Sequence, residues 1–232
     1  MKLRFTALIA VTCALALLLV GSAGAALIGV YRNTMEGKDQ RGQMVKLAGE
    51  RCARGGSDHA FRVMIGKRTK ECSYRTPVVG RDLEIAAVAR LLRSTPMSLQ
   101  RKAFLALDLR AGGAGARYQL AVYPLQRKAQ LRKVLSDGSV QYLRIAKNVK
   151  TVKGLDGANE LRLRAFNVTS GPEKGKCHVL AYVGKTLVAD VTDDASGDLQ
   201  GRASGFSVGA GTNAKGLVAS LDDIVIRLPS PF

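Results

Sequence analysis

The sequence predicts an all-β fold, an antiparallel two-sheet sandwich, behind one apolar N-terminal segment. Beyond residue 57, short apolar runs recur at regular spacing and are separated by Gly, Pro, Asn, Asp and Ser, a pattern typical of sandwiches and barrels. Within residues 159–165, apolar and charged residues alternate, and this period of two is that of a strand with one buried face. Outside the N-terminus no long run has helical period, which disfavours an α/β fold.

About eleven strands are expected on this pattern. Leu105, Leu107 and Leu109 share one face of their run, and a turn at Gly184 joins the two strands of a hairpin. In the second strand of that hairpin, residues 187, 189 and 191 are expected to share a face. The expected strands occupy residues 60–66, 82–92, 101–110, 116–124, 129–135, 140–146, 159–165, 177–193 (two strands), 204–208 and 220–228.

The N-terminus carries the clearest single signal. From Phe5 to Tyr31 the chain has 27 residues without a charge, and a membrane-spanning helix needs about 20. Lys2 and Arg4 precede this run, so we expect a transmembrane signal anchor over residues 1–31 with the rest extracytoplasmic. The alternative is a signal peptide cleaved near Ala25, after which the protein is secreted.

The polar stretch 32–56 is expected to be a juxtamembrane linker, with a short helix over residues 43–51. The β-sandwich domain is then expected to occupy residues 57–232.

The charge balance predicts an affinity for polyanions. Lys and Arg number 36 against 18 acids, which gives a net charge of +18, and a field of that sign attracts anionic lipids, acidic wall polymers and nucleic acid. Nucleic acid fits poorly, because the aromatic-basic pattern of RNA-recognition modules is missing from the sequence. A solvated sheet face is the structural alternative. The candidate polyanion-binding residues are Arg127, Lys128, Arg132, Lys133, Lys147, Lys150 and Lys153.

Three cysteines lie beyond the apolar segment. Cys52 and Cys72 enclose a loop short enough to close easily, so we expect a disulfide between them and a buried thiol at Cys177. Pairing of Cys177 with either of the others is the alternative. A Cys/His metal site is disfavoured, because the chain has two histidines and lacks C-x-x-C.

Asp193, Asp194 and Asp198 form an oxygen-rich loop that could hold a structural calcium ion, although no other cofactor is expected. The alternative is turn chemistry, which favours the same residue types.

Catalytic motifs are missing from the sequence. It lacks G-x-S-x-G, and Glu84, Asp108 and Glu160 are single acids on separate expected strands, whereas a glycosidase needs two carboxylates about 5–9 Å apart. The sequence therefore predicts a protein that is not an enzyme.

Residues 159–229 carry a family resemblance. In order, they contain "NELRLRAFN", the hairpin "CHVLAYVGKTLVADVTD", "GDLQGRASGFSVGAG" and "ASLDDIVIRLP". This order resembles the closing half of concanavalin-A-like (laminin-G-like) jelly rolls. The resemblance implies two antiparallel sheets stacked face to face.

The resemblance implies carbohydrate or protein binding more often than catalysis. Sugars stack on exposed aromatic rings, and the chain has no Trp, which leaves Tyr118, Tyr123, Tyr142 and Tyr182 as candidates. We therefore expect a non-catalytic, membrane-anchored extracytoplasmic module that binds a saccharide or anionic envelope polymer or a protein partner. The alternatives are a carbohydrate-active enzyme of the same fold and a structural envelope protein.

Overall fold

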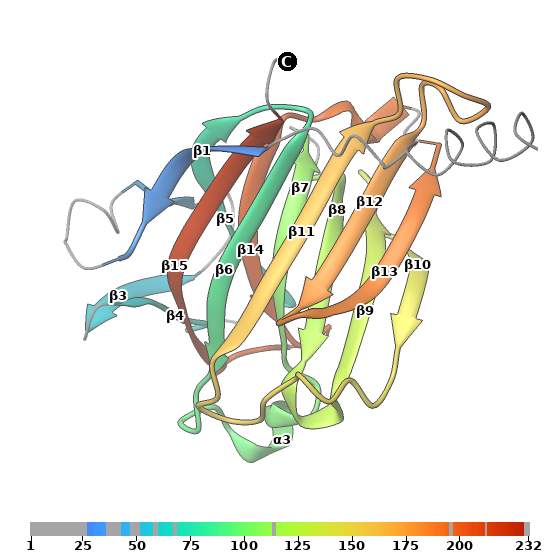
Figure 1. Ribbon diagram of the computed structural model, residues 1–232. Coiled ribbons are helices and arrows are strands. Elements are labelled where there is room, and N and C mark those ends of the chain that lie inside the picture. Colours follow the sequence, from blue (N-terminus) through green and yellow to red (C-terminus); the bar gives the residue numbers. More distant parts are fainter. Residues whose placement is uncertain are drawn as a thin grey trace, which may run out of the picture.

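The computed structural model describes residues 27–35, 43–46, 52–57, 60–66, 69–112, 115–194, 197–211 and 213–229. In this part of the chain two antiparallel β-sheets lie face to face, as Figure 1 shows. The all-β, two-sheet antiparallel sandwich expected from the sequence is confirmed.

The first sheet has eight strands in the order β13-β12-β11-β6-β15-β4-β3, with β1 also paired to β15. Its strands are β1 (Leu27–Asn33), β3 (Ala53–Ser57), β4 (Ala60–Met64), β6 (Leu83–Leu91), β11 (Asn159–Asn167), β12 (Cys177–Val183), β13 (Thr186–Asp193) and β15 (Val218–Pro229).

The second sheet has seven strands in the order β10-β9-β8-β7-β14-β5-β2. Its strands are β2 (Val45–Lys46), β5 (Glu71–Val79), β7 (Phe104–Ala111), β8 (Arg117–Tyr123), β9 (Lys128–Val134), β10 (Val140–Ala146) and β14 (Ala203–Gly209). Short helical turns, α3 (Met97–Gln100), η1 (Pro124–Gln126) and η2 (Gly197–Gln200), lie in the connections.

One hydrophobic core fills the space between the sheets. It takes the inward set of each strand, including the leucines of β7 at 105, 107 and 109, as the alternation predicted. The outward set of β7 is buried too, so every residue of this strand is buried. On the outer face of this sheet, Phe104, Ala106 and Ala121 form a second, smaller packed cluster.

The hairpin of β12 and β13 departs from strict alternation. The register shifts between the Ala181↔Ala189 pair and the Tyr182↔Leu187 pair, so Val188 is an extra residue, a β-bulge. Val188 and Ala189 are therefore both buried, whereas Leu187 is 46% exposed. The expectation that residues 187, 189 and 191 share one face is wrong at Leu187, because a bulge reverses the alternation.

The N-terminal boundary also differs from the expected one. Strand β1 pairs antiparallel with β15, from Leu27 against Pro229 to Asn33 against Ile224. Residues 27–31, expected at the end of the N-terminal helix, thus belong to the sandwich. The rest of that expected helix, residues 1–26, lies outside the described residues. Among the residues described, no helix is long and apolar enough to cross a membrane.

The expected linker, residues 32–56, contributes the end of β1, all of β2 and most of β3. The expected short helix over 43–51 is contradicted where the structure describes it, because Val45 and Lys46 form β2 against β5. The sandwich therefore begins near residue 27 and not at residue 57.

The structure joins Cys52 and Cys72 by a disulfide with a Cα–Cα distance of 5.9 Å. Cys52 precedes β3 of the eight-stranded sheet and Cys72 lies on β5 of the seven-stranded sheet, so the bond links the two sheets. Cys177 is a free, buried cysteine.

Candidate functional site

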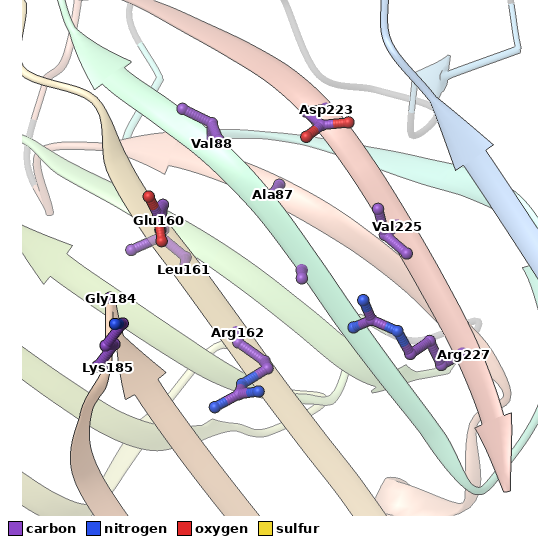
Figure 2. A pocket seen from close by; sticks show the side chains of 11 residues that line it. Ala87, Val88, Glu160, Leu161, Arg162, Gly184, Lys185, Asp223, Val225 and Arg227 are labelled. Carbon is purple, nitrogen blue, oxygen red and sulfur yellow. The ribbon is translucent and has the colours of Figure 1, made fainter. Parts of the chain in front are cut away.

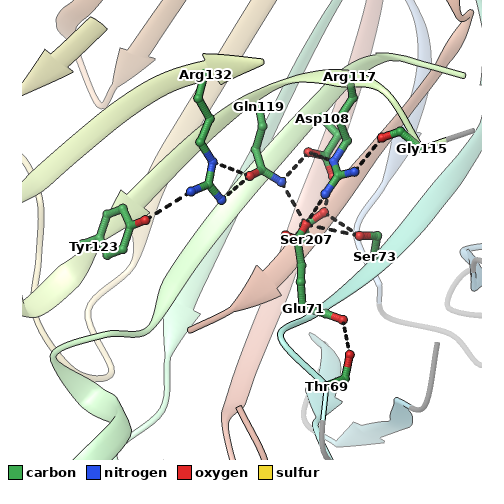
Figure 3. A network of polar contacts seen from close by, with 10 residues as sticks. All are labelled: Thr69, Glu71, Ser73, Asp108, Gly115, Arg117, Gln119, Tyr123, Arg132 and Ser207. Carbon is green, nitrogen blue, oxygen red and sulfur yellow. Dashed lines mark hydrogen bonds and ion pairs between the residues drawn. The ribbon is translucent and has the colours of Figure 1, made fainter. Parts of the chain in front are cut away.

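A polar network covers the centre of the outer face of the seven-stranded sheet (Figure 3). Side chains alternate along a strand, so the residues between the core positions of β5, β7, β8, β9 and β14 point outward. In this sheet they bond to one another across five strands. The network consists of Glu71, Ser73, Asp108, Arg117, Gln119, Tyr123, Arg132 and Ser207.

Asp108 on β7 is the centre of this network and is 2% exposed. Its Oδ1 accepts from Arg117 Nε at 3.2 Å and from Gln119 Nε2 at 2.8 Å, and its Oδ2 accepts from Ser207 Oγ. Burial raises the pKa of the Asp108 carboxyl, and the Arg117 guanidinium opposes that rise. The buried carboxylate is thus tolerated because three donors surround it.

Glu71 on β5 shares two of these donors. Its Oε1 accepts from Arg117 Nη2 at 2.5 Å and from Gln119 Nε2 at 2.9 Å. The two carboxylates therefore lie on either side of one guanidinium and one amide, and the charge of Glu71 further raises the pKa of Asp108.

Arg132 on β9 extends the network toward the sheet edge. Its Nε donates to Gln119 Oε1 at 2.7 Å, and its Nη1 donates to the Tyr123 hydroxyl at 3.3 Å. Its guanidinium also lies 4.7 Å from the centroid of the Phe104 ring. Arg132 is 6% exposed, so this cation supports the sheet and is not presented to solvent.

Beyond Arg132 the face opens and becomes aromatic and basic. Lys128 Nζ lies 4.0 Å from the centroid of the Tyr123 ring. Burial lowers the pKa of Lys128, and the nearby cations Arg132 and Lys147 lower it further. Tyr142 on β10 lies directly opposite Arg132 and is 53% exposed. The β9–β10 end of this face therefore offers a ring and cations to solvent.

Gln130 lies on the same face of β9, between Lys128 and Arg132. Its side-chain Oε1 is buried and finds no hydrogen-bond partner among the described residues. Buried acceptors are nearly always paired. Rotation of this amide toward solvent would let a ligand hydroxyl or amide donate to it.

A basic groove of about 420 Å³ continues this face around the sheet edge, where β10 meets β13. Its cations are Arg144, Lys147 and Lys150, and its lining has no carboxylate. Leu187 and Ile145 are apolar parts of its wall and are 46% and 44% exposed. The groove can therefore attract an anionic group beside an apolar surface.

The seven basic residues expected to bind a polyanion do not form one patch. Arg132 is part of the buried network, and Lys133 faces inward, where its Nζ lies 2.7 Å from Asp193 Oδ1. This inward direction follows from its register opposite the core residue Tyr118. Lys128 lies on the aromatic end of the face, Lys147 and Lys150 line the basic groove, and Arg127 and Lys153 are exposed outside that groove.

Of the three residues expected to hold calcium, the structure describes the side chains of Asp193 and Asp194. Both oxygens of Asp193 are engaged, one with Lys133 and the other with the Tyr118 hydroxyl at 2.6 Å. Asp194 is exposed, and the side chain of Asp198 lies outside the described part of the chain. Among the described residues there is no group of three or more His, Cys, Asp or Glu side chains that could hold a metal ion.

Sequence reasoning missed the network because its members come from distant segments. Glu71 and Arg117 are separated by 46 positions, and Asp108 and Ser207 by 99. Asp108 and Gln119 were visible as polar residues within apolar strands, which is the one local signal of such a network. Their mutual contact depends on strand order, which no local pattern specifies.

Comparison with known proteins identifies the class of fold. No protein-family model matches the chain, and no curated protein matches its sequence. Among solved structures, the carbohydrate-binding module CBM66 from Bacillus subtilis matches with a TM-score of 0.58 at 14% identity, over 78% of this chain and 93% of that one.

Two further structures agree. A protein of unknown function with a galectin-like fold from Bacillus subtilis has a TM-score of 0.60 at 14% identity, over 88% of this chain and 100% of that one. A β-glucanase from Bacillus licheniformis has a TM-score of 0.58 at 9% identity, over 86% and 98%. The fold is thus the concanavalin-A-like, galectin-like jelly roll, as the resemblance over residues 159–229 predicted.

Proposed function

We propose that this chain is a non-catalytic carbohydrate-binding module whose ligand is an acidic saccharide polymer. The ligand lies on the outer face of the seven-stranded sheet, at its β9–β10 end. There a sugar ring stacks on Tyr142, and its carboxylate or sulfate meets Lys128 and Lys147.

The observation that carries this proposal is the juxtaposition of an exposed ring with cations. Tyr142 is 53% exposed opposite Arg132, near Tyr123, and Lys128 lies over the Tyr123 ring. The ring of tyrosine presents an apolar body with a polar edge. The lowered pKa of Lys128 reflects crowding by Arg132 and Lys147 as well as burial, and an anion bound there would relieve that repulsion. The similar folds include a carbohydrate-binding module, and the net charge of +18 favours an acidic ligand.

The test is binding of the full chain, purified in detergent, to acidic and neutral oligosaccharides at low and high salt. We expect the acidic set to bind and its affinity to fall steeply with salt. Tyr142→Ala should weaken binding about 5-fold at both salt concentrations. Lys128→Gln and Lys147→Gln should each weaken it about 5-fold at low salt only.

Lys174→Gln is the matched control, because it removes an exposed cation on the loop between β11 and β12. If Lys174→Gln weakens binding as much as Lys128→Gln does, the attraction is general and the site proposal is wrong. Equal binding of neutral and acidic oligosaccharides would contradict the acidic ligand.

The second candidate is a carbohydrate-active enzyme that uses Glu71 and Asp108. What favours it is a close carboxylate pair on an outer sheet face with one pKa raised by burial, which is the arrangement of a glycosidase acid and its partner. Against it, the oxygens of both acids are bonded to Arg117 and Gln119 and Asp108 is buried. Hydrolysis of a bound oligosaccharide that Glu71→Gln abolishes would favour the enzyme.

We also propose that the N-terminal segment directs export and is removed near Ala25. Strand β1 begins at Leu27, immediately beyond the small-residue sequence Ala23–Ala25. A membrane helix that extended to Tyr31 would include residues 27–31, and these residues form the strand that pairs with β15. A mature N-terminus at Ala26, read by mass spectrometry, supports the proposal, and an intact residue 1 on the membrane-bound protein would contradict it.

A further inference from the structure

The outer face of the eight-stranded sheet has a hollow of about 500 Å³ (Figure 2). It lies over β6, between β11 and β15, on the opposite side of the sandwich from the polar network. Its lining residues are Ala86, Ala87, Val88, Glu160, Leu161, Arg162, Gly184, Lys185, Asp223, Val225 and Arg227.

The hollow exists because the central strand carries small residues on its outward positions. Ala86 on β6 is paired with Arg162 on one side and with Val225 on the other. The methyl group of Ala86 is shorter than the side chains of Arg162 and Val225 on either side, which leaves a depression along the strand. Val88 and Val225 are partly exposed and supply an apolar floor.

The strand register separates the charges that β11 and β15 contribute to this hollow into two rows. At the level of Val88, Glu160 stands on β11 and Asp223 stands on the bulge of β15. Two residues further along the strands, Arg162 is paired with Ala86. Arg227 on β15 is paired with Glu84, two residues beyond Ala86. Figure 2 shows the two acids toward one end and the two arginines toward the other.

The acidic row is open to solvent. Glu160 is exposed, and its carboxylate has no ion-pair partner among the described residues. Asp223 has a left-handed backbone, φ 47°, at the register shift of β15, and bulges of this kind redirect a side chain. Its partner Arg32 lies 3.2 Å away, but both side chains are largely exposed, so this pair is easily exchanged.

Each arginine of the basic row contacts a residue of a neighbouring strand. The Arg162 guanidinium lies 4.0 Å from the centroid of the Tyr182 ring, which orients it without using its N–H groups. Arg227 Nη1 lies 2.6 Å from Glu84 Oε1, and Glu84 is buried. Arg162 is therefore the fixed cation that remains available to a carboxylate.

The spacing of the two rows is close to the length of a short zwitterion. The backbones of Glu160 and Arg162 are two residues apart on one strand, about 7 Å. The ammonium and carboxylate of an extended dipeptide are also separated by two residues, about 7 Å. We propose that the hollow binds a short extended zwitterionic peptide parallel to β11, with its ammonium at Glu160 and Asp223, its carboxylate at Arg162, and small side chains on Val88 and Val225.

The test is titration of the full chain with Ala-Ala, followed by NMR of the β6 and β11 amides. A shallow, open site of this kind should bind with a Kd of about 1 mM. N-acetyl-Ala-Ala and Ala-Ala amide each lack one charge and should bind at least about 5-fold more weakly. Free alanine should also bind weakly, because its two charges are one residue apart.

Variants separate the site from general electrostatics. Glu160→Gln and Arg162→Gln should each weaken Ala-Ala binding about 5-fold or more, and Ala86→Met should abolish it by filling the floor. Arg164→Gln removes the same charge as Arg162→Gln from the same strand but outside the hollow and should not weaken binding. Loss of binding in Arg164→Gln equal to that in Arg162→Gln, or no shift with Ala-Ala in the unmodified protein, would overturn the proposal.

Discussion

The two outer faces of this sandwich use the same strand alternation in opposite ways. On the seven-stranded sheet, outward polar residues bond to one another, so that Asp108 is 2% exposed and Gln119 is 0% exposed. On the eight-stranded sheet, outward charges such as Glu160 and Arg162 stand apart and face solvent. The alternation of a strand therefore shows which side chains point outward, but not whether those side chains are exposed to solvent.

This difference has a physical cause in what surrounds the charges. Asp108 has Arg117, Gln119 and Ser207 on neighbouring strands, so each donor removed from water finds an acceptor. Ala86 and Val88 separate Glu160 and Arg162 from β15 and offer no such partners. The centre of the first face is therefore closed by its own hydrogen bonds, whereas its β9–β10 end and the second face keep exposed charges.

The largest expected difference between the two faces is the effect of removing Asp108 on the free energy of unfolding. Asp108→Ala removes one of the two carboxylates that accept from Arg117 and Gln119 and leaves Ser207 without its acceptor, so it should lower the free energy of unfolding by about 3–5 kcal/mol. Glu160→Ala on the other face should change it by less than about 0.5 kcal/mol. Urea unfolding of both variants measures the difference, and similar losses would show that the faces are equivalent.

The next largest effect concerns the interior between the two sheets, where the buried thiol of Cys177 makes stability depend on pH. Burial raises the pKa of the Cys177 thiol to about 11 from 9.0. The folded state therefore holds this proton more tightly than the unfolded state, and stability is lost as pH rises through this window. The expected loss from this group between pH 9 and 11 is roughly 2 kcal/mol.

Cys177→Ala should lose correspondingly less stability than the unmodified protein over the same pH range, measured by urea unfolding at each pH. Glu160→Ala should retain the full alkaline loss, because it leaves the interior unchanged. An identical pH dependence in Cys177→Ala would assign the loss to another group.

A matched pair of arginines gives a smaller effect. Arg132 and Arg162 each lie over an aromatic ring, at 4.7 and 4.0 Å, but Arg132 also bonds to the buried Gln119. Arg132→Gln should lower the unfolding free energy by about 2 kcal/mol, and Arg162→Gln by about 0.5 kcal/mol. Thermal unfolding of the two variants measures both losses. A loss in Arg162→Gln as large as that in Arg132→Gln would contradict the difference between the two faces.

The smallest expected effect concerns calcium. Asp193 is engaged by Lys133 and Tyr118, so millimolar calcium should shift the Tm by less than about 1 °C relative to chelator. A calorimetric scan with and without calcium measures it. A clear rise in Tm that Asp194→Asn removes would restore the calcium site expected from the sequence.

The strands could be predicted where one face is apolar and the other polar. Residues 159–165 and the leucines of β7 were assigned correctly because a period of two is local information. Strand β5 was not among the expected strands, since it contains Pro77, and Glu71 and Arg75 interrupt its apolar character. Strand β1 was missed because it continues an apolar run that also satisfies the length of a membrane helix.

The placement of the basic side chains could be predicted only in part. Charge alone named Lys128, Lys147 and Lys150, which are at least partly exposed, together with Arg132 and Lys133, which are buried because their direction depends on register with β8. The hollow beside Ala86 has no sequence signature, since it arises from three strands that are distant in the chain. Pairwise register is long-range information that neither spacing nor composition contains.

The pairing of β1 with β15 has a mechanical consequence. Leu27 lies opposite Pro229, so the first residue of β1 and the last residue of β15 meet at one end of the same ladder. A force applied between these two points would open the ladder one hydrogen bond at a time, like a zipper, and little tension would suffice. A load between Leu27 and a ligand held on the opposite sheet would instead pull on the whole sandwich and be shared by many bonds at once.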